Sequence, residues 1–184
     1  MQQTSIHEII ISITNCFTKA KIPFCVAGGI AVSLWGHIRA TEDIDIIALI
    51  DADNENQIIT ALHNHFKILP HKDTMLQSTL TPIKRYVIIA NASHFVVDVL
   101  LATNDFLKQC IQNSKIFTLS GINIPVICIE DLIVMKCASG RHQDIADIQS
   151  LLAASLPVDK SYIDSQIQKL NIAIPEGVKD LILQ

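Results

Sequence analysis

Two aspartates separated by a single residue, Asp43 and Asp45, have the type and spacing to hold a metal ion. They begin the segment DIDIIALI, whose isoleucines predict a buried strand. Side chains alternate along a strand, so both carboxylates should point to the same face of a sheet. Neighbouring carboxylates repel each other, and an ordered pair generally needs a cation or a shared proton. Ligands that are all oxygen atoms favour Mg²⁺, or Mn²⁺, over zinc.

A third acid, Asp98, interrupts the apolar segment HFVVDVLLA, where a buried and unpaired charge would be costly. We therefore expect Asp98 to join Asp43 and Asp45 as a metal ligand. Gly28 and Gly29 precede these acids at a predicted strand-to-helix junction, and their missing Cβ atoms would let a phosphate approach backbone N–H groups. Taken singly, a D-x-D or a Gly-Gly pair is more often structural. Their order, together with the later acid, favours metal-assisted phosphoryl or nucleotidyl transfer.

The elements that must position these residues follow from hydrophobic periodicity and turn signals. Apolar residues recur at helical spacing over 5–20, and residues 23–27 form a short apolar strand that ends at the glycines. Two apolar strands joined by Asn91-Ala92-Ser93 are predicted to form the hairpin that carries Asp98. In the first half of the chain, the other predicted elements are a helix over 30–35, a strand over 43–50, a turn over 51–57, a helix over 55–66 and an irregular stretch or weak strand over 67–82. The two strands of the hairpin cover 83–90 and 94–102, and a helix capped by Thr103 or Asn104 follows and ends at Gln112. A second hairpin turns at Ser120-Gly121, and the rest is helical, with helices over 129–139 and 142–154 and two short helices after Pro157.

This order of elements indicates an α/β protein of one domain. We expect a mixed sheet core over residues 1–127 and a helical C-terminal part over residues 128–184. A chain of 184 residues can bury roughly 70% of its unfolded surface in such a domain.

Composition narrows the class of protein. Hydrophobic residues make up 49% of the chain and the mean hydropathy is +0.37. The longest uncharged stretches are nevertheless far shorter than the ~20 residues of a membrane span. The first residues also lack the basic start of a signal peptide. We therefore expect a cytoplasmic protein that does not enter a membrane.

Charge and cysteine content exclude further classes. The net charge of −4 provides no basic surface for tight, nonspecific binding of nucleic acid, but a local patch for a small RNA acceptor stays open. The five cysteines are odd in number and show no C-x-x-C spacing. We expect them to be reduced thiols in the core, without a zinc site.

The segment GGIAVSLWGHIRATEDIDI, followed by VVDVL, resembles the DNA polymerase β-like nucleotidyltransferase superfamily. The connecting pattern G-x-x-R-x-T-x-D-I-D looks most like the AbiEii-type toxin nucleotidyltransferases and their small relatives. The resemblance covers roughly residues 20–155. It implies a minimal nucleotidyltransferase fold, a mixed β-sheet flanked by helices with a helical C-terminal segment. It also implies NTP as substrate, Mg²⁺ or Mn²⁺ as cofactor, and Asp98 as a candidate general base.

The helical segment IEDLIVMKCASGRHQDIADIQSLL supports the same resemblance. Similar families place a Lys near the triphosphate and an Asp near the active centre, which by resemblance are Lys136 and Asp144. A lysine there would neutralise the leaving pyrophosphate. The alternative is an ordinary helix pair with Arg141 and Asp144 as a surface ion pair at i,i+3. Where relatives often have a Lys before this Asp, the chain has Gln143.

Two further residues belong to the expected nucleotide site. Ser33 lies one helical turn after Gly29 and could reach the γ-phosphate, or could face the core. Arg39 precedes the acid pair and could contact phosphate, or could simply offset the acidic charge.

Together these features predict a metal-dependent enzyme that transfers NMP from an NTP to an acceptor. By resemblance, the acceptor could be RNA, such as a tRNA end, in a toxin–antitoxin or phage-defence system with an antitoxin-like protein partner. The first alternative is an antibiotic nucleotidyltransferase of the aminoglycoside or lincosamide type, which acts on a small molecule. The second is a module that binds nucleotide or a partner protein without transfer. Fold analogy alone does not decide among the three.

Overall fold

The computed structural model describes residues 5–50, 55–69, 75–76, 78, 80–91 and 93–183. In this part of the chain the strands are β1 (Phe24–Val26), β2 (Asp43–Ala48), β3 (Lys67–Leu69), β4 (Met75–Leu76), β5 (Ile83–Ala90), β6 (Ser93–Leu101), β7 (Lys115–Leu119) and β8 (Ile122–Val126). The helices are α1 (Ile6–Lys19), α2 (Gly28–Leu34), α3 (Glu55–His63), α4 (Asp105–Gln112), α5 (Ile129–Ser139), α6 (His142–Ala153), α7 (Lys160–Lys169) and α8 (Lys179–Leu183), with a 3₁₀ turn at Glu176–Val178.

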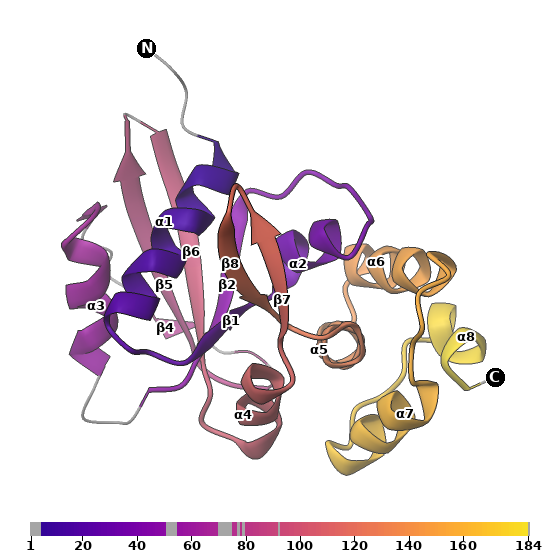
Figure 1. Cartoon of the computed structure of the whole chain (residues 1–184). Helices are drawn as coiled ribbons and strands as arrows, with labels where there is room; N and C mark the ends of the chain where they lie inside the picture. Colours follow the sequence, from indigo (N-terminus) through magenta and orange to yellow (C-terminus); the bar gives the residue numbers. More distant parts are fainter. Residues whose placement is uncertain are drawn as a thin grey trace.

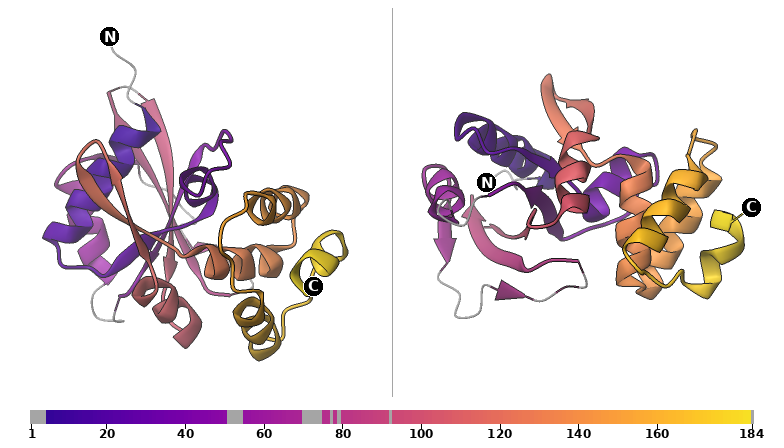
Figure 2. Two further views of the ribbon diagram at one scale, coloured as in Figure 1. Left: turned by 45° about the vertical axis from the view of Figure 1, so that its right-hand side comes forward. Right: turned by 90° about the horizontal axis from the view of Figure 1, so that it is seen from below.

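The strands form one mixed sheet in the order β3-β5-β6-β2-β1-β8-β7, with β4 paired to β5. Most neighbours are antiparallel, but β2 runs parallel to β6 and β1 runs parallel to β8. The predicted α/β fold with a helical C-terminal segment is confirmed. In Figure 1, α1 and α3 lie together on one side of the sheet, while α5 to α8 gather near the C-terminus. The two further views in Figure 2 show the same separation.

Local signals in the sequence account for several element ends. Ser5 and Glu8 form the capping box that starts α1. Asn104 caps α4, because its side chain accepts a hydrogen bond from the backbone of Leu107. The β7–β8 hairpin turns at two consecutive residues with positive φ, Ser120 and Gly121, as a tight hairpin requires.

Several boundaries differ from the prediction, among them the end of β2, which lies at Ala48 rather than at residue 50. The helix α2 begins at Gly28 rather than at residue 30, because Ala31 N–H already bonds to the carbonyl oxygen of Ala27. The helix α3 ends at His63 rather than at residue 66. The strand β6 begins at Ser93, which the prediction placed in the turn. Of the turn predicted over 51–57, residues 51–54 lie outside the described residues, and residues 55–57 belong to α3.

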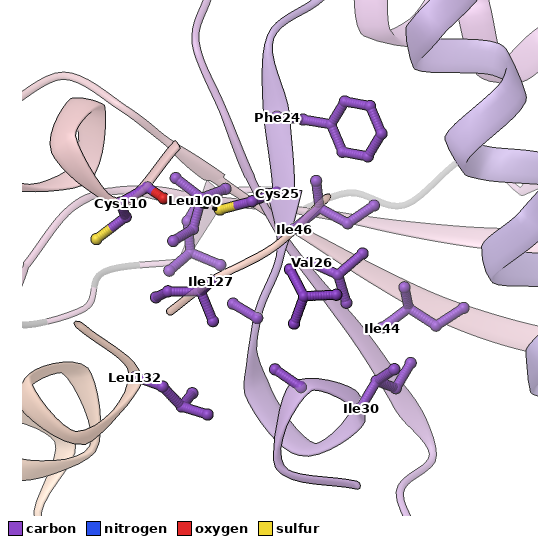
Figure 3. Close-up of a cluster of buried hydrophobic side chains, with 14 of the residues drawn as sticks. Phe24, Cys25, Val26, Ile30, Ile44, Ile46, Leu100, Cys110, Ile127 and Leu132 are labelled. Carbon is purple, nitrogen blue, oxygen red and sulfur yellow. Dashed lines mark hydrogen bonds between the residues drawn. The ribbon is translucent and has the colours of Figure 1, made fainter. Parts of the chain in front are cut away.

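Part of the core lies on the face of β2 opposite its aspartates. Ile44 and Ile46 are fully buried there, and Figure 3 shows them in a cluster with Val26 of β1 and Leu132 of α5. This cluster fixes which way β2 faces, because a shift by one residue would turn Asp43 and Asp45 toward the apolar side chains. No helix in the described ranges is long and apolar enough to cross a membrane.

Candidate functional site

Sheet register places three charged residues side by side. On the parallel pair β2–β6, Asp45 is opposite Asp98, and on the antiparallel pair β5–β6, Asp98 is opposite Arg85. Directly paired residues share a face of the sheet. Asp43 lies two residues before Asp45 and therefore points to the same face. The three acids predicted from the sequence are thus brought together, with an arginine that the prediction did not include.

Asp45 is a partly buried carboxylate without a hydrogen-bond donor among the described residues. Burial and repulsion from Asp98 and Asp43 raise the pKa of Asp45 to about 6. Its side chain lies against Gly28, whose φ is +60°, and a Cβ atom at Gly28 would fall only 1.8 Å from Asp45 Oδ2. Glycine is required at this position both for the backbone conformation and for the space.

Asp98 differs from Asp45 because both of its carboxylate oxygens accept hydrogen bonds. It is 5% exposed, and both of its oxygens accept hydrogen bonds from Arg85, from Nε at 2.8 Å and from Nη2 at 2.6 Å. The same Nη2 atom lies 3.9 Å from Asp43 Oδ2. These bonds raise the pKa of Arg85, which stays a cation at any physiological pH. A two-bond pair of this kind is among the strongest polar contacts in proteins.

The hairpin turn explains why the sequence did not reveal this pair. A turn of three residues, Asn91-Ala92-Ser93, would have paired Ala90 with His94 and placed Asp98 opposite Tyr86. In the structure Ala90 pairs with Ser93. That one-residue difference moves Arg85 opposite Asp98. Predicting a two-residue turn would have identified Arg85 as the residue opposite Asp98.

The loop before β2 folds over the second glycine of the turn. A Cβ atom at Gly29 would lie 2.6 Å from Arg39 Nη2 and 2.7 Å from Thr41 Oγ1. Ser33 donates to the carbonyl oxygens of Gly29 and Arg39, at 3.1 and 3.3 Å, so its hydroxyl joins α2 to this loop. The glycine pair therefore accommodates neighbouring side chains closely, and it places the Arg39 guanidinium directly over the turn.

Lys136 lies in a buried ion-pair cluster rather than free in the cavity. It is 5% exposed, and its Nζ donates to Asp144 at 2.9 Å and to Asp147 at 2.6 Å. Arg39 Nε lies 3.1 Å from Asp147, and Arg141 Nε donates to Asp144 at 2.8 Å. The predicted i,i+3 pair of Arg141 and Asp144 is present, but Asp144 is buried and only Arg141 is exposed.

Most of these groups line one cavity of about 700 Å³ between the sheet and α5–α6. Its lining includes the acids Asp43, Asp45 and Asp98 and the basic residues Arg39, Arg85, Lys136 and Arg141. It also includes Gly28 and Asp144, whereas Ser33 is not part of the lining. A space of this size, with convergent charged groups, is that of a small-molecule site.

The donor set suits a divalent cation in its chemistry but not in its present arrangement. Three carboxylates on one face are the oxygen ligands that Mg²⁺ prefers, and Asp45 has no other partner among the described residues. However, within the described residues, no group of three or more Asp, Glu, His or Cys side chains is arranged closely enough to hold a metal ion. The Asp98 oxygens face Arg85 instead, so a metal shared by all three acids would need side-chain movement.

Comparisons with known proteins give the family of the chain. A family model described as "Nucleotidyltransferase of unknown function (DUF6036)" matches residues 5–174. No curated protein sequence matches the chain.

Solved structures of nucleotidyltransferases share the fold. An antigenic nucleotidyltransferase-like protein from Paracoccidioides brasiliensis has a TM-score of 0.59 and 16% identity, over 92% of this chain and 93% of that chain. ANT(2")-Ia, solved in complex with adenylyl-2"-tobramycin, has a TM-score of 0.61 and 12% identity, over 91% and 98%. The lincosamide antibiotic adenylyltransferase LnuA, with lincomycin bound, has a TM-score of 0.52 and 20% identity, over 82% and 98%. At these identities the likeness is one of fold.

Proposed function

Because the chain belongs to DUF6036, a family of nucleotidyltransferases of unknown function, we propose that it transfers NMP from an NTP to an acceptor hydroxyl or phosphate in a metal-dependent reaction that releases pyrophosphate. The observation that carries this proposal is the register of β2 and β6. It brings Asp45 beside Asp98, with Asp43 on the same face, at the wall of a cavity large enough for a nucleotide.

Asp43 and Asp45 would hold Mg²⁺ or Mn²⁺, with Asp98 completing the site. A divalent ion there would neutralise phosphate charge and acidify the attacking hydroxyl. Asp98 is also the candidate general base, because its carboxylate could accept the proton of that hydroxyl. Both roles require that Arg85 release at least one oxygen of Asp98.

The triphosphate would lie between the glycine turn and the basic residues of the cavity. Arg39 over Gly29 and the exposed Arg141 each offer N–H groups suited to phosphate. Lys136 already donates to two carboxylates, so its role would be to fix Asp144 and Asp147 and to add positive charge behind the phosphates. The Ser33 hydroxyl would reach the γ-phosphate only by giving up its bonds to the loop.

The acceptor is proposed on two separate grounds. The resemblance of the motif around Arg39 to AbiEii-type toxins is the ground for an RNA acceptor, such as a tRNA end, in a toxin–antitoxin or phage-defence setting with an antitoxin-like partner. A small-molecule acceptor is the second candidate, because the fold is shared with ANT(2")-Ia over nearly the whole of both chains.

A transfer assay distinguishes these acceptors. The protein is incubated with each α-labelled NTP, with and without Mg²⁺ or Mn²⁺, together with total RNA or with a panel of aminoglycosides and lincosamides. We expect metal-dependent label in one pool, lost in Asp45→Asn and kept in Asp105→Asn, which removes an exposed acid on α4. Label in RNA supports the toxin-like branch, and label in a drug supports the resistance branch. If neither pool is labelled although NTP and metal bind, the chain is a binding module.

A further inference from the structure

Arg85 occupies the position between two acids that a shared metal ion would need. Its Nη2 atom is 2.6 Å from Asp98 Oδ2 and 3.9 Å from Asp43 Oδ2, and its Nε atom bonds to the other oxygen of Asp98. Arg85 and Asp98 are fixed opposite each other by eight consecutive pairs of the β5–β6 hairpin. The contact is therefore held by the sheet and does not depend on a loop.

Arg85 is about one-third exposed (34% of its side chain), whereas the Asp98 side chain is 7% exposed. A buried carboxylate that loses its only cation is costly. Asp98 thus needs a positive partner at all times, and either the guanidinium or a divalent ion can supply it. Both cannot occupy the same two oxygens.

We propose that Arg85 is a positioning residue that sets the metal affinity of this site. Its guanidinium holds the Asp98 carboxylate until a divalent cation displaces the guanidinium. This inference rests on the proposed function only in taking the three carboxylates as a cation site. It means that Asp43 and Asp45 meet the incoming ion first, and that Asp98 becomes a ligand only when the guanidinium turns away. A guanidinium that has turned away stays in the cavity, which Arg85 itself lines.

The consequence is a measurable penalty on metal binding. When the binding-competent state is a minor state, the apparent affinity falls by the fraction of molecules in that state. For a minor state populated at about 1–10%, the loss is roughly tenfold to a hundredfold. Removing Arg85 should remove this penalty.

The test is a calorimetric titration of Mn²⁺ into the whole chain without nucleotide. We expect Arg85→Met to bind Mn²⁺ roughly tenfold to a hundredfold more tightly than wild type, and Arg85→Lys, which keeps the charge but not the two-bond geometry, to fall between them. The matched control is Lys84→Met, which removes the same charge one residue away on the opposite face of β5 and should leave the affinity unchanged.

Thermal melting with and without Mn²⁺ tests the same inference if Arg85→Met folds poorly. Without metal, Arg85→Met leaves Asp98 unpaired and should melt at a lower temperature than wild type, and Mn²⁺ should restore more stability to the variant than it adds to wild type. If Arg85→Met does not fold, the Mn²⁺ affinity of Arg85→Lys decides.

Three results would overturn the inference. They are an Arg85 variant that binds Mn²⁺ no more tightly than wild type, a Lys84→Met variant that gains as much as Arg85→Met, and an absence of Mn²⁺ binding in every form. The first two leave the proposed transfer reaction intact, because the titration contains no nucleotide. The third leaves the reaction to the labelling assay, because an NTP can carry the metal on its own phosphate oxygens.

Discussion

Asp45 and Asp98 are neighbours in register but differ in chemistry. Asp98 accepts two hydrogen bonds from a guanidinium, whereas Asp45 has no donor among the described residues and carries a raised pKa of about 6. The difference comes from what each side chain contacts: Asp98 faces the Arg85 guanidinium, whereas Asp45 packs against Gly28, which has no side chain. Asp45 is therefore the residue with most to gain from a cation.

The strain at Asp45 gives a stability prediction. Asp45→Asn removes the repulsion from Asp43 and Asp98 and should leave the melting temperature of the metal-free protein unchanged or raise it, by roughly 2–4 °C for each kcal/mol of repulsion relieved. Any transferase activity should be lost, as in other stability–activity trade-offs. Differential scanning calorimetry near neutral pH measures the change. A clear drop in melting temperature would show that Asp45 has a structural partner.

Lys136 gives a second prediction at the residue scale. Lys136→Ala removes the cation that Asp144 and Asp147 share and leaves both carboxylates buried, so it should destabilise the protein by roughly 3–5 kcal/mol. The matched control is Lys108→Ala, at an exposed position on α4, with an expected effect within about 0.5 kcal/mol. Urea denaturation compares the two. Equal, small effects would mean that Lys136 is not a structural ion-pair partner.

At the scale of elements, ion pairs join α5, α6 and the loop before β2. Lys136 of α5 bonds to Asp144 and Asp147 of α6, and Asp147 also pairs with Arg39 of the loop. The loop in turn covers Gly29 at the start of α2. The wall of the cavity that faces the sheet is thus held by charge rather than by apolar packing alone.

This dependence on charge predicts how the helix pair responds to pH. Burial alone would raise the pKa of Asp144, but bonds from Arg141 and the attraction of Lys136 outweigh it and lower the pKa below its usual 3.8. A lowered pKa in the folded state contributes stability that is complete above the unfolded-state pKa and is lost as the pH falls through the folded-state pKa. Asp144→Asn should therefore cost stability near neutral pH, with a cost that shrinks below about pH 3.8. Urea denaturation of wild type and variant across this range measures it, and a cost independent of pH would contradict the assignment.

At the scale of the whole molecule, the C-terminal helices are built into the core. Leu132 of α5 is buried in the same cluster as the central strands (Figure 3). The fully buried Asp131 accepts a hydrogen bond of 2.6 Å from the hydroxyl of Tyr162 on α7. On Glu130, a carboxylate oxygen accepts from the backbone of Asp159, the cap of α7. These contacts tie α7 to α5, and α5 to the sheet.

Such continuity predicts one cooperative unit. We expect a single thermal transition for the full chain, and we expect the fragment 1–127 to lack a cooperative transition, because it loses the apolar cover of α5 and one wall of the cavity. Calorimetry and circular dichroism of both forms test this. A fragment that melts cooperatively near the temperature of the full chain would show that residues 128–184 form a separate unit.

The sequence by itself determined the α/β fold, the order of the elements and the shared face of Asp43 and Asp45. These features follow from local periodicity and turn chemistry, which act between residues close in the chain. The placement of Asp98 beside Asp45 was expected from the motif, but its physical basis is the parallel pairing of β2 and β6.

Only the tertiary structure decided the partners of the charged groups. Arg85 meets Asp98 because a hairpin turn is one residue shorter than the sequence suggested, and Lys136 meets two carboxylates because α5 and α6 pack together. An ion pair depends on distances of a few ångströms between side chains far apart in sequence, and a one-residue change of register is enough to reverse a side chain's face. Periodicity predicts which residues are charged and which way a strand faces, but the packing of the elements decides which charges neutralise one another.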